Sequence, residues 1–238
     1  MKAFLLAAGH GTRLRPLTEH TPKCLVPIGG VPMLSIWLDL CAAHNISEVL
    51  INVHSHAEVV RDYLAKANGR GVHVRISEEP VLLGSAGTLA ANRDWVGSED
   101  CFWVLYSDVL TTANLSDMLA FHRRQRQLAT LGLYEVPDPT RCGIVKLDTA
   151  GIIWEFVEKP KVPASNLAFS GLMLASPAVI DLIPSQSQVD IGFHLLPQLV
   201  GRMSGYNIKG YLVDIGTLRN YQVAQRTWPG LGSLSTHD

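Results

Sequence analysis

The chain has 238 residues, of which 47% are hydrophobic and 17% are charged, and its 20 basic side chains nearly balance 21 acidic ones. This composition excludes intrinsic disorder, and the length is typical of one large domain or one domain with a small appendage. The near-neutral balance leaves no broad basic face for nucleic acid, so any site for a phosphate group must be local.

The first part of the chain alternates short apolar runs with segments that carry apolar residues at helical spacing. We expect strands at residues 2–8, 48–53, 72–76, 101–106 and 129–136, and helices at 31–44, 57–67, 85–93 and 114–126. Strands that alternate with helices in this way predict an α/β fold with a doubly wound, mainly parallel sheet.

The order of elements changes after residue 136. Two short strands at 143–147 and 152–158 flank a turn at 148–151, which predicts a β-hairpin. We expect a further strand at 167–174, helices at 177–183 and 193–200, a last strand at 209–213 and a last helix at 218–226. The tail, 229–238, lacks apolar periodicity and is expected to fray.

Cysteine spacing and apolar run lengths bear on the compartment. The four cysteines are widely spaced and predict free thiols under reducing conditions; they are Cys24, Cys41, Cys101 and Cys142. The first apolar run is too short for the core of a signal peptide, and no apolar stretch reaches the length of a membrane span. We therefore expect a cytoplasmic protein with no membrane partner.

A loop at residues 9–23 (GHGTRLRPLTEHTPK) combines two glycines with Arg13, Arg15 and Lys23, directly after the first predicted strand. Glycine lets a ligand approach the backbone closely, and Arg and Lys donate to phosphate oxygens. The loop has no G-K-[ST] triplet of a Walker A motif and no third glycine of a dinucleotide fingerprint. It predicts an anion site of another kind, the alternative being a solvated basic turn.

Two acidic residues, Asp108 and Asp214, are each expected just past the end of a predicted strand. Ligands gather at that edge of an open α/β sheet, and carboxylate oxygens suit Mg²⁺. The alternative for each residue alone is a solvated or helix-capping aspartate.

Two other polar groups fit simpler interpretations. His54 and His56 follow a predicted strand without a third ligand nearby, so surface residues are favoured over a metal site. Arg123, Arg124 and Arg126 fall on a predicted helix and are interpreted as a solvated face. No serine or cysteine has the context of a nucleophile elbow.

Residues 8–18 (AGHGTRLRPLT), followed by Pro22 and Lys23, resemble the signature of the sugar-1-phosphate nucleotidylyltransferases. Residues 83–88 (LGSAGT), 106–108 (YSD), 157–160 (VEKP) and 214–217 (DIGT) are similar to later motifs of that family, in its order. The resemblance covers about residues 1–226. Ala8 departs from the family by replacing the first of two glycines, and Ser107 replaces the glycine before the metal-binding aspartate.

The resemblance implies a Rossmann-like, mixed but mainly parallel sheet with a small β-hairpin subregion for a sugar. It implies one domain over residues 1–228, with a nucleotide-binding half over about 1–135, a sugar-phosphate half over about 136–228 and the tail at 229–238. No acetyltransferase or regulatory domain is expected.

The resemblance also implies the site residues. Arg13 and Lys23 would be catalytic, and Asp108 and Asp214 would hold Mg²⁺. The nucleotide would be bound by Leu6, Ala8, Gly9, Gly11, Thr12, Gly84, Ser85, Gly87 and Thr88. The sugar phosphate would be bound by Gly143, Glu158, Lys159, Asn166, Ser170 and Gly171.

The implied partners are a nucleoside triphosphate (NTP) and a sugar 1-phosphate, which would give a nucleotide sugar and pyrophosphate. The loop at 83–88 is more similar to the guanylyl branch, which serves mannose or heptose 1-phosphate. Thymidylyl, uridylyl or cytidylyl transfer to another hexose, aminosugar or muramate 1-phosphate stays open, as does the oligomeric state. A non-catalytic nucleotide-sugar sensor and a glycosyltransferase are the competing classes; the second has no need of a triphosphate-binding loop.

Overall fold

The computed structural model describes residues 1–232, and the chain divides into two compact units. Unit 1 comprises Met1–Leu82, Leu105–Asn114 and the segment from Lys209 onward, and unit 2 comprises Leu83–Val104 and Leu115–Ile208. Most of the predicted tail, residues 233–238, lies outside the described residues.

Unit 1 is built on parallel strands joined by helices. Strand β1 (Lys2–Leu6) pairs in parallel with β4 (Glu48–Val53), and β4 pairs in parallel with β5 (His73–Glu78). Helices α1 (Met33–Ala43) and α2 (Ala57–Ala67) provide the crossovers that parallel strands require. The centre of β1 is fully buried, as expected for a parallel strand covered on both faces.

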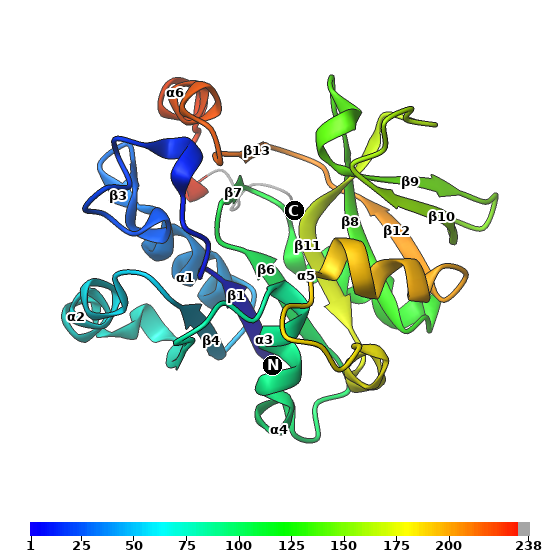
Figure 1. Ribbon diagram of the computed structural model, residues 1–238, viewed down its shortest axis with the longest axis horizontal. Helices are drawn as coiled ribbons and strands as arrows, with labels where there is room; N and C mark the ends of the chain where they lie inside the picture. The colour runs from blue at the N-terminus through cyan, green and yellow to red at the C-terminus, as the bar shows by residue number, and fades with distance from the viewer. Residues whose placement is uncertain (233–238) are drawn as a thin grey trace. The chain divides into compact units, whose positions relative to one another are not determined.

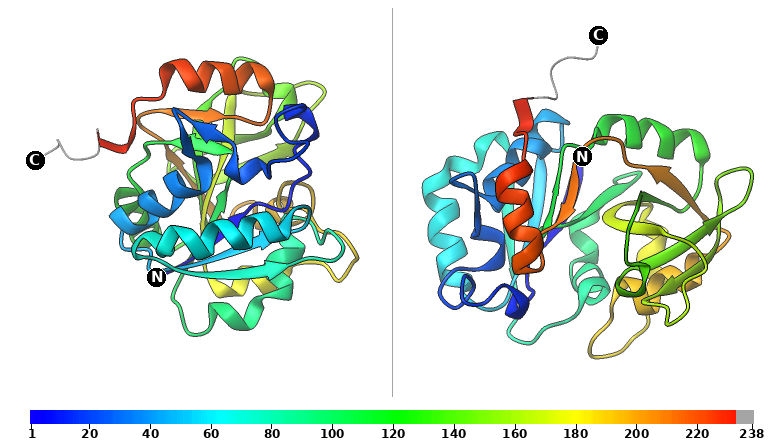
Figure 2. Two further views of the ribbon diagram at one scale, coloured as in Figure 1. Left: turned by 90° about the vertical axis from the view of Figure 1, so that its left-hand side faces the viewer. Right: turned by 90° about the horizontal axis from the view of Figure 1, so that it is seen from above.

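The rest of unit 1 comes from two later segments of the chain. Strand β6 (Phe102–Tyr106) ends in this unit, and the Ser107 N–H after it donates to the Leu6 carbonyl at 3.1 Å. A short antiparallel ladder joins β7 (Val109–Thr111) to β13 (Leu212–Asp214), and helix α6 (Leu218–Thr227) follows. Figure 2 shows α6 beside the hairpin of β2 (Pro27–Ile28) and β3 (Val31–Pro32), where Gln225 donates to the Pro27 carbonyl.

Unit 2 holds the mixed part of the sheet and the predicted hairpin (Figure 1). Strand β8 (Ala129–Glu135) pairs antiparallel with β11 (Leu167–Ala175) and parallel with β12 (Met203–Asn207). Strands β9 (Gly143–Leu147) and β10 (Ile153–Glu158) form the hairpin around the turn at Asp148. The helices of this unit are α3 (Ser85–Ala91), α4 (Arg93–Val96) and α5 (Leu115–Gln125).

The α/β class with a mixed, mainly parallel sheet and flanking helices is confirmed. Strand β4, helix α2 and strand β9 have the predicted bounds. Within residues 1–232, no helix combines the length and apolar character needed to cross a bilayer.

Some expected elements differ from the prediction. The helix expected at 177–183 is a 3₁₀ segment, Pro177–Leu182, and that at 193–200 is a π-helical turn, Ile191–Leu195, followed by a 3₁₀ turn, Leu196–Leu199. Proline at 197 removes a backbone donor and interrupts a regular helix. Strand β12 was not expected, and β13 begins three residues later than predicted. Further 3₁₀ turns lie at Thr12–Leu14, Lys23–Leu25, Asn68–Gly71 and Pro139–Arg141.

Candidate active site

The predicted phosphate loop leaves the end of β1 and is tied to the neighbouring strands. The Ala7 N–H donates to Asn52 Oδ1 at 2.7 Å, and Asn52 Nδ2 donates to Glu79 Oε1 at 2.9 Å. Asn52 and Glu79 are both buried, so this network fixes where the loop begins. Ala8 is buried, whereas Gly9 and Thr12 are exposed and Leu6 is half-buried.

Gly11 gives the loop its turn. Its φ is +62°, in the left-handed region that favours glycine, and its carbonyl accepts a 2.7 Å hydrogen bond from Thr18 Oγ1. A Cβ at Gly11 would lie 3.0 Å from Thr18 Cγ2. Both the backbone conformation and the packing therefore require glycine here.

A cluster of four charged side chains, Arg13, Lys23, Asp108 and Asp214, lies within unit 1; it is called the charged cluster below. The Lys23 ammonium forms an ion pair with the Asp108 carboxylate. A Cβ built on Gly216 would lie 2.7 Å from Asp214 Oδ1, 3.0 Å from Arg13 Nη2 and 3.3 Å from Lys23 Nζ. The missing side chain of Gly216 thus lets two cations and a carboxylate converge on one point.

The β7–β13 ladder positions the two carboxylates of the charged cluster. Asp214 is the last residue of β13 and pairs with Val109, the residue after Asp108. The Ile215 N–H donates to the Asp108 carbonyl at 2.9 Å, and the Gly216 N–H donates to Asp214 Oδ1 at 2.6 Å. Thr217 then caps α6, so a strand, a turn and a helix start hold Asp214 in place.

Electrostatics make this pair of carboxylates suited to a cation. Burial raises the pKa of Asp214 above its usual value and the nearby Asp108 carboxylate raises it further, while the Gly216 N–H, Lys23 and Arg13 act in the opposite direction. Within residues 1–232, no set of three or more His, Cys, Asp or Glu side chains is arranged to hold a metal. Two carboxylates are nevertheless a fitting donor set for Mg²⁺, which takes one or two carboxylates and completes its shell with phosphate and water.

The predicted base-binding loop is docked within unit 2 onto residues 189–191. The Ala86 and Gly87 N–H groups donate to the Val189 carbonyl at 2.9 and 3.1 Å. A Cβ on Gly84, whose φ is +80°, would lie only 2.4 Å from that same carbonyl oxygen. Ser85 Oγ donates to Asp190 Oδ2 at 3.0 Å, and Thr88 is fully buried.

The predicted sugar-phosphate residues Glu158 and Lys159 follow the end of β10. Their side chains form an ion pair of 3.5 Å between Lys159 Nζ and Glu158 Oε1, with 54% and 13% of the respective side chains exposed. The Lys159 N–H donates to the Cys142 carbonyl at 2.9 Å. Burial raises the pKa of Glu158 above its usual value, the Lys159 ammonium opposes this shift, and the Asp190 carboxylate adds to it.

Two glycines make room for the Glu158 carboxylate. A Cβ on Gly143 would lie 2.7 Å from Glu158 Oε2, and a Cβ on Gly192 would lie 2.4 Å from the same oxygen. Gly143 is predicted to bind the sugar phosphate, but the space next to it is occupied by Glu158 and the Phe156 ring. The backbone turns away from the extended conformation at Lys159, whose φ is +49°.

The three remaining predicted sugar residues lie on or before β11. Asn166 is exposed, and its carbonyl accepts from the Val136 N–H at 2.9 Å. Ser170 is 3% exposed, and its Oγ accepts from the Leu172 N–H at 3.3 Å. Gly171 has a φ of +83° where the register of β11 against β8 shifts. Their role in binding stays a prediction.

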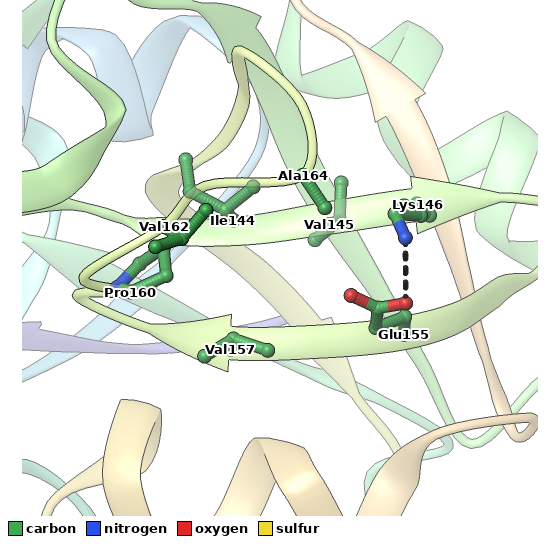
Figure 3. Close-up of a pocket in the computed structure, with 8 residues that line it drawn as sticks. All are labelled: Ile144, Val145, Lys146, Glu155, Val157, Pro160, Val162 and Ala164. Carbon is green, nitrogen blue, oxygen red and sulfur yellow. Dashed lines mark hydrogen bonds and ion pairs between the residues drawn. The ribbon is translucent and has the colours of Figure 1, made fainter.

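A small cavity of about 60 Å³ lies between the β9–β10 hairpin and the following loop (Figure 3). An ion pair of 2.9 Å between Lys146 and Glu155 lies at its wall. The other lining residues are Ile144, Val145, Val157, Pro160, Val162 and Ala164. None of the predicted site residues lines this cavity.

Sequence reasoning missed Gly216, Gly192 and Asp190 as residues that shape the surroundings of the predicted site residues. Asp190 caps the π-helical turn by accepting from the Gly192 and Phe193 N–H groups at 2.8 and 3.2 Å. The signal that could have found them is a repeated tripeptide, Asp-Ile-Gly, at 190–192 and 214–216.

Comparison with known proteins agrees with this arrangement. The chain is 33% identical over 234 residues to the probable mannose-1-phosphate guanylyltransferase 1 of Oryza sativa subsp. japonica and equally to mannose-1-phosphate guanylyltransferase 1 of Arabidopsis thaliana. Each match covers 96% of this chain but 64% of the relative, so the chain spans about two-thirds of the length of these relatives.

A solved structure has the same fold over nearly the whole chain. A putative glucose-1-phosphate thymidylyltransferase from Bacillus anthracis superposes with a TM-score of 0.85 at 28% identity, covering 95% of this chain and 94% of that one. The family model for nucleotidyl transferase matches residues 2–228, a span that holds every predicted site residue. The glycine loop, the charged cluster and these matches together establish that the chain belongs to the nucleotidyl transferase family.

Proposed function

We propose that the protein transfers a nucleotidyl group from an NTP to a sugar 1-phosphate and releases pyrophosphate. The observation that carries this proposal is the convergence of Arg13, Lys23 and Asp214 on the open face of Gly216, with Asp108 paired to Lys23. Two cations and two carboxylates beside a glycine loop suit a polyphosphate and the Mg²⁺ ion that accompanies it.

The reaction is an in-line displacement at the α-phosphorus. A phosphate oxygen of the sugar 1-phosphate forms the new P–O bond, the bond between the α-phosphorus and its bridging oxygen breaks, and pyrophosphate leaves with that oxygen. The nucleophile is already an anion, so no general base is needed. The protein's task is to align two polyanions and to offset the negative charge of the transition state.

Arg13 and Lys23 would divide this task. The Arg13 guanidinium presents a planar fork of donors suited to the β- and γ-phosphates and to the leaving pyrophosphate. Lys23 is a compact charge suited to the attacked phosphate. Its ion pair with Asp108 holds the ammonium beside the second carboxylate of the charged cluster until a phosphate oxygen replaces that partner.

Asp108 and Asp214 would hold Mg²⁺. The raised pKa of Asp214 supports this, because two carboxylates so close together are stabilised as anions by a cation. When bound, Mg²⁺ would supply positive charge for the phosphate oxygens. Gly216 would leave room for these ligands, and its N–H keeps the Asp214 carboxylate oriented.

In unit 2, the loop at 83–88 would bind the base, and Glu158 and Lys159 would bind the sugar 1-phosphate. Glu158 is suited to accept from sugar hydroxyls and Lys159 to pair with the phosphate. Guanylyl transfer to mannose or heptose 1-phosphate is the first choice, supported by the names of the plant relatives and by residues 83–88. Thymidylyl transfer is the second, because a solved neighbour of 28% identity is described as a putative glucose-1-phosphate thymidylyltransferase.

The test is a pyrophosphate-release screen of the four NTPs and dTTP against a panel of sugar 1-phosphates, with Mg²⁺ and with excess chelator. We expect release that needs both substrates and stops when the metal is removed. Full activity in chelator would exclude the metal assignment. Tight binding of a nucleotide sugar without turnover of any pair would favour the sensor class instead.

A further inference from the structure

Phe193 is an exposed aromatic residue on a tightly bonded turn. Its residue surface is 52% exposed, while its neighbours Ile191 and Gly192 are buried. One exposed apolar residue is ordinary on a protein surface and by itself indicates nothing. Its surroundings are more informative, because the ring lies against a charged side chain of the proposed sugar-phosphate site.

The Lys159 ammonium lies 5.2 Å from the centroid of the Phe193 ring, within the range of a cation–π interaction. The same ammonium pairs with the half-buried Glu158 carboxylate at 3.5 Å. A flexible lysine is thus held between a carboxylate and a ring face. Lys159 has a left-handed backbone, with φ at +49°, directly after the end of β10 at Glu158.

The turn that carries Phe193 has little freedom. Asp190 Oδ1 accepts from the Phe193 N–H, and Asp190 Oδ2 accepts from Ser85 Oγ. His194 Nδ1 accepts from the Asp190 N–H at 2.9 Å, and the Ile191 N–H donates to Ser85 Oγ at 2.7 Å. Hydrogen bonds therefore hold the backbone of the turn that carries the Phe193 ring, although 52% of the residue's surface faces solvent.

Resting on the proposed function, we propose that Phe193 is a positioning and specificity residue for the sugar 1-phosphate. Its ring holds the Lys159 ammonium in place for the phosphate, and the exposed part of the ring packs against the apolar C–H face of a pyranose. An aromatic ring offers a large apolar contact at small cost in conformational entropy. The ligand class is a hexopyranose 1-phosphate, which has such a face next to its phosphate.

The variant Phe193→Leu keeps an apolar side chain and removes the ring. We expect it to raise the KM for sugar 1-phosphate about 3- to 30-fold, the equivalent of one cation–π contact, with the KM for NTP and the kcat nearly unchanged. Phe193→Tyr, which keeps a ring face, should restore the wild-type KM. A normal KM in Phe193→Leu, or no rescue by tyrosine, overturns the proposal.

Unit 2 offers a matched control on strand β10. Trp154 on β10 is 50% exposed and has the Lys146 ammonium 5.0 Å from its ring centroid, but it lies outside the proposed site. Trp154→Leu removes the same kind of contact. It should leave the KM for sugar 1-phosphate unchanged, and an increase as large as that of Phe193→Leu would show a general effect of surface rings and overturn the proposal.

Two readouts are independent of turnover. In protein labelled with ¹³C-lysine, the ε-methylene protons of Lys159, assigned through Lys159→Arg, should be shifted upfield by the Phe193 ring and return to the ordinary position in Phe193→Leu. If the wild type turns over no substrate pair, the proposed function fails, and calorimetric titration with mannose 1-phosphate decides the inference. Equal affinities of the wild type and Phe193→Leu, or absence of binding to both, would overturn it.

Discussion

Two turns of identical sequence, Asp-Ile-Gly, serve the two units in different ways. At 190–192 in unit 2 and at 214–216 in unit 1, the aspartate Oδ1 accepts from the glycine N–H, at 2.8 and 2.6 Å. In both turns, a side chain on the glycine would collide with charged side chains of the proposed site. Glu158 fills the space at Gly192, and Arg13, Lys23 and Asp214 surround the space at Gly216.

The difference lies in what the aspartate does. Asp214 is itself a member of the charged cluster, and its pKa is raised by burial and by Asp108. Asp190 is a structural cap that bonds Ser85 and the start of the π-helical turn. The same local turn therefore brings charged side chains together in unit 1 and leaves room for the Glu158 carboxylate in unit 2. We therefore expect substitutions at the turn in unit 1 to slow the chemical step, and those at the turn in unit 2 to weaken the binding of one substrate.

The largest effect is expected from the cations of the charged cluster. Lys23→Ala and Arg13→Ala should each lower kcat/KM by about 10²- to 10³-fold, the cost of losing one preorganised charge at a phosphoryl centre. Arg15→Ala, an exposed arginine of the same loop, is the matched control and should be nearly wild type. Equal losses in all three variants would show a loss of general positive charge rather than of these two groups.

A smaller and more selective effect is expected at Lys159. Lys159→Ala should raise the KM for sugar 1-phosphate by roughly 10- to 150-fold, because one charged hydrogen bond is worth about 1.5–3 kcal/mol. Glu158→Gln should blunt discrimination among sugars and leave the base preference unchanged. Calorimetry with NTP provides the contrast: a loss of NTP affinity as large as the loss for the sugar phosphate would place Lys159 in the nucleotide site.

The two glycines allow a direct comparison of the turns. A methyl group on Gly216 would displace Asp214, Arg13 or Lys23, and we expect Gly216→Ala to lower kcat roughly 10- to 100-fold with little change in the KM for sugar 1-phosphate. Gly192→Ala would displace Glu158 and should act mainly on the KM for sugar 1-phosphate. Gly232→Ala, where a Cβ meets no atom of residues 1–232 within 4 Å, is the control. The comparison of the turns fails if both glycine variants alter the same kinetic constant.

These glycines mark the limit of what the sequence alone could predict. The long motif in the first loop and the apolar periodicity were enough to locate β4, α2 and β9 with their bounds and to name all four members of the charged cluster. The repeated Asp-Ile-Gly could have pointed to Gly192 and Gly216, but Glu158, Arg13 and Lys23, which lie next to them, are distant in sequence, so no local pattern shows what these glycines make room for.

The elements that differ from the prediction have similar causes. Strand β12, with the sequence MSGYN, has little apolar alternation and is formed by parallel pairing with β8, more than sixty residues earlier. The segment around Pro197 has the apolar content of a helix, but the missing donor interrupts it. The left-handed backbone of Lys159 is unusual for lysine, and only the fold around it could show it.

The smallest expected effect concerns stability and pH. Because the folded-state pKa of Asp214 is raised above its usual 3.8, ionisation of this group lowers the stability of the folded protein as the pH rises through and above that value. Asp214→Asn keeps the acceptor for the Gly216 N–H and removes the charge. In metal-free buffer its Tm should exceed that of the wild type at pH 7, and the difference should shrink as the pH falls toward 3.8.

Added Mg²⁺ should reverse this order, because a ligand that binds only the folded state raises its stability. It should raise the Tm of the wild type and leave that of Asp214→Asn nearly unchanged. Asp62→Asn, an exposed carboxylate on α2, is the control and should show neither effect. A Tm difference between Asp214→Asn and the wild type that does not vary with pH would contradict the assignment.

The central claim, nucleotidyl transfer, is tested most directly by following the label of an α-³²P-labelled NTP in the wild type. With GTP and mannose 1-phosphate, or with the pair selected by the screen, all of the label should appear in the nucleotide sugar, in amounts equal to the pyrophosphate released. Label recovered as free nucleoside monophosphate, or left in the triphosphate with every sugar 1-phosphate, would contradict the claim.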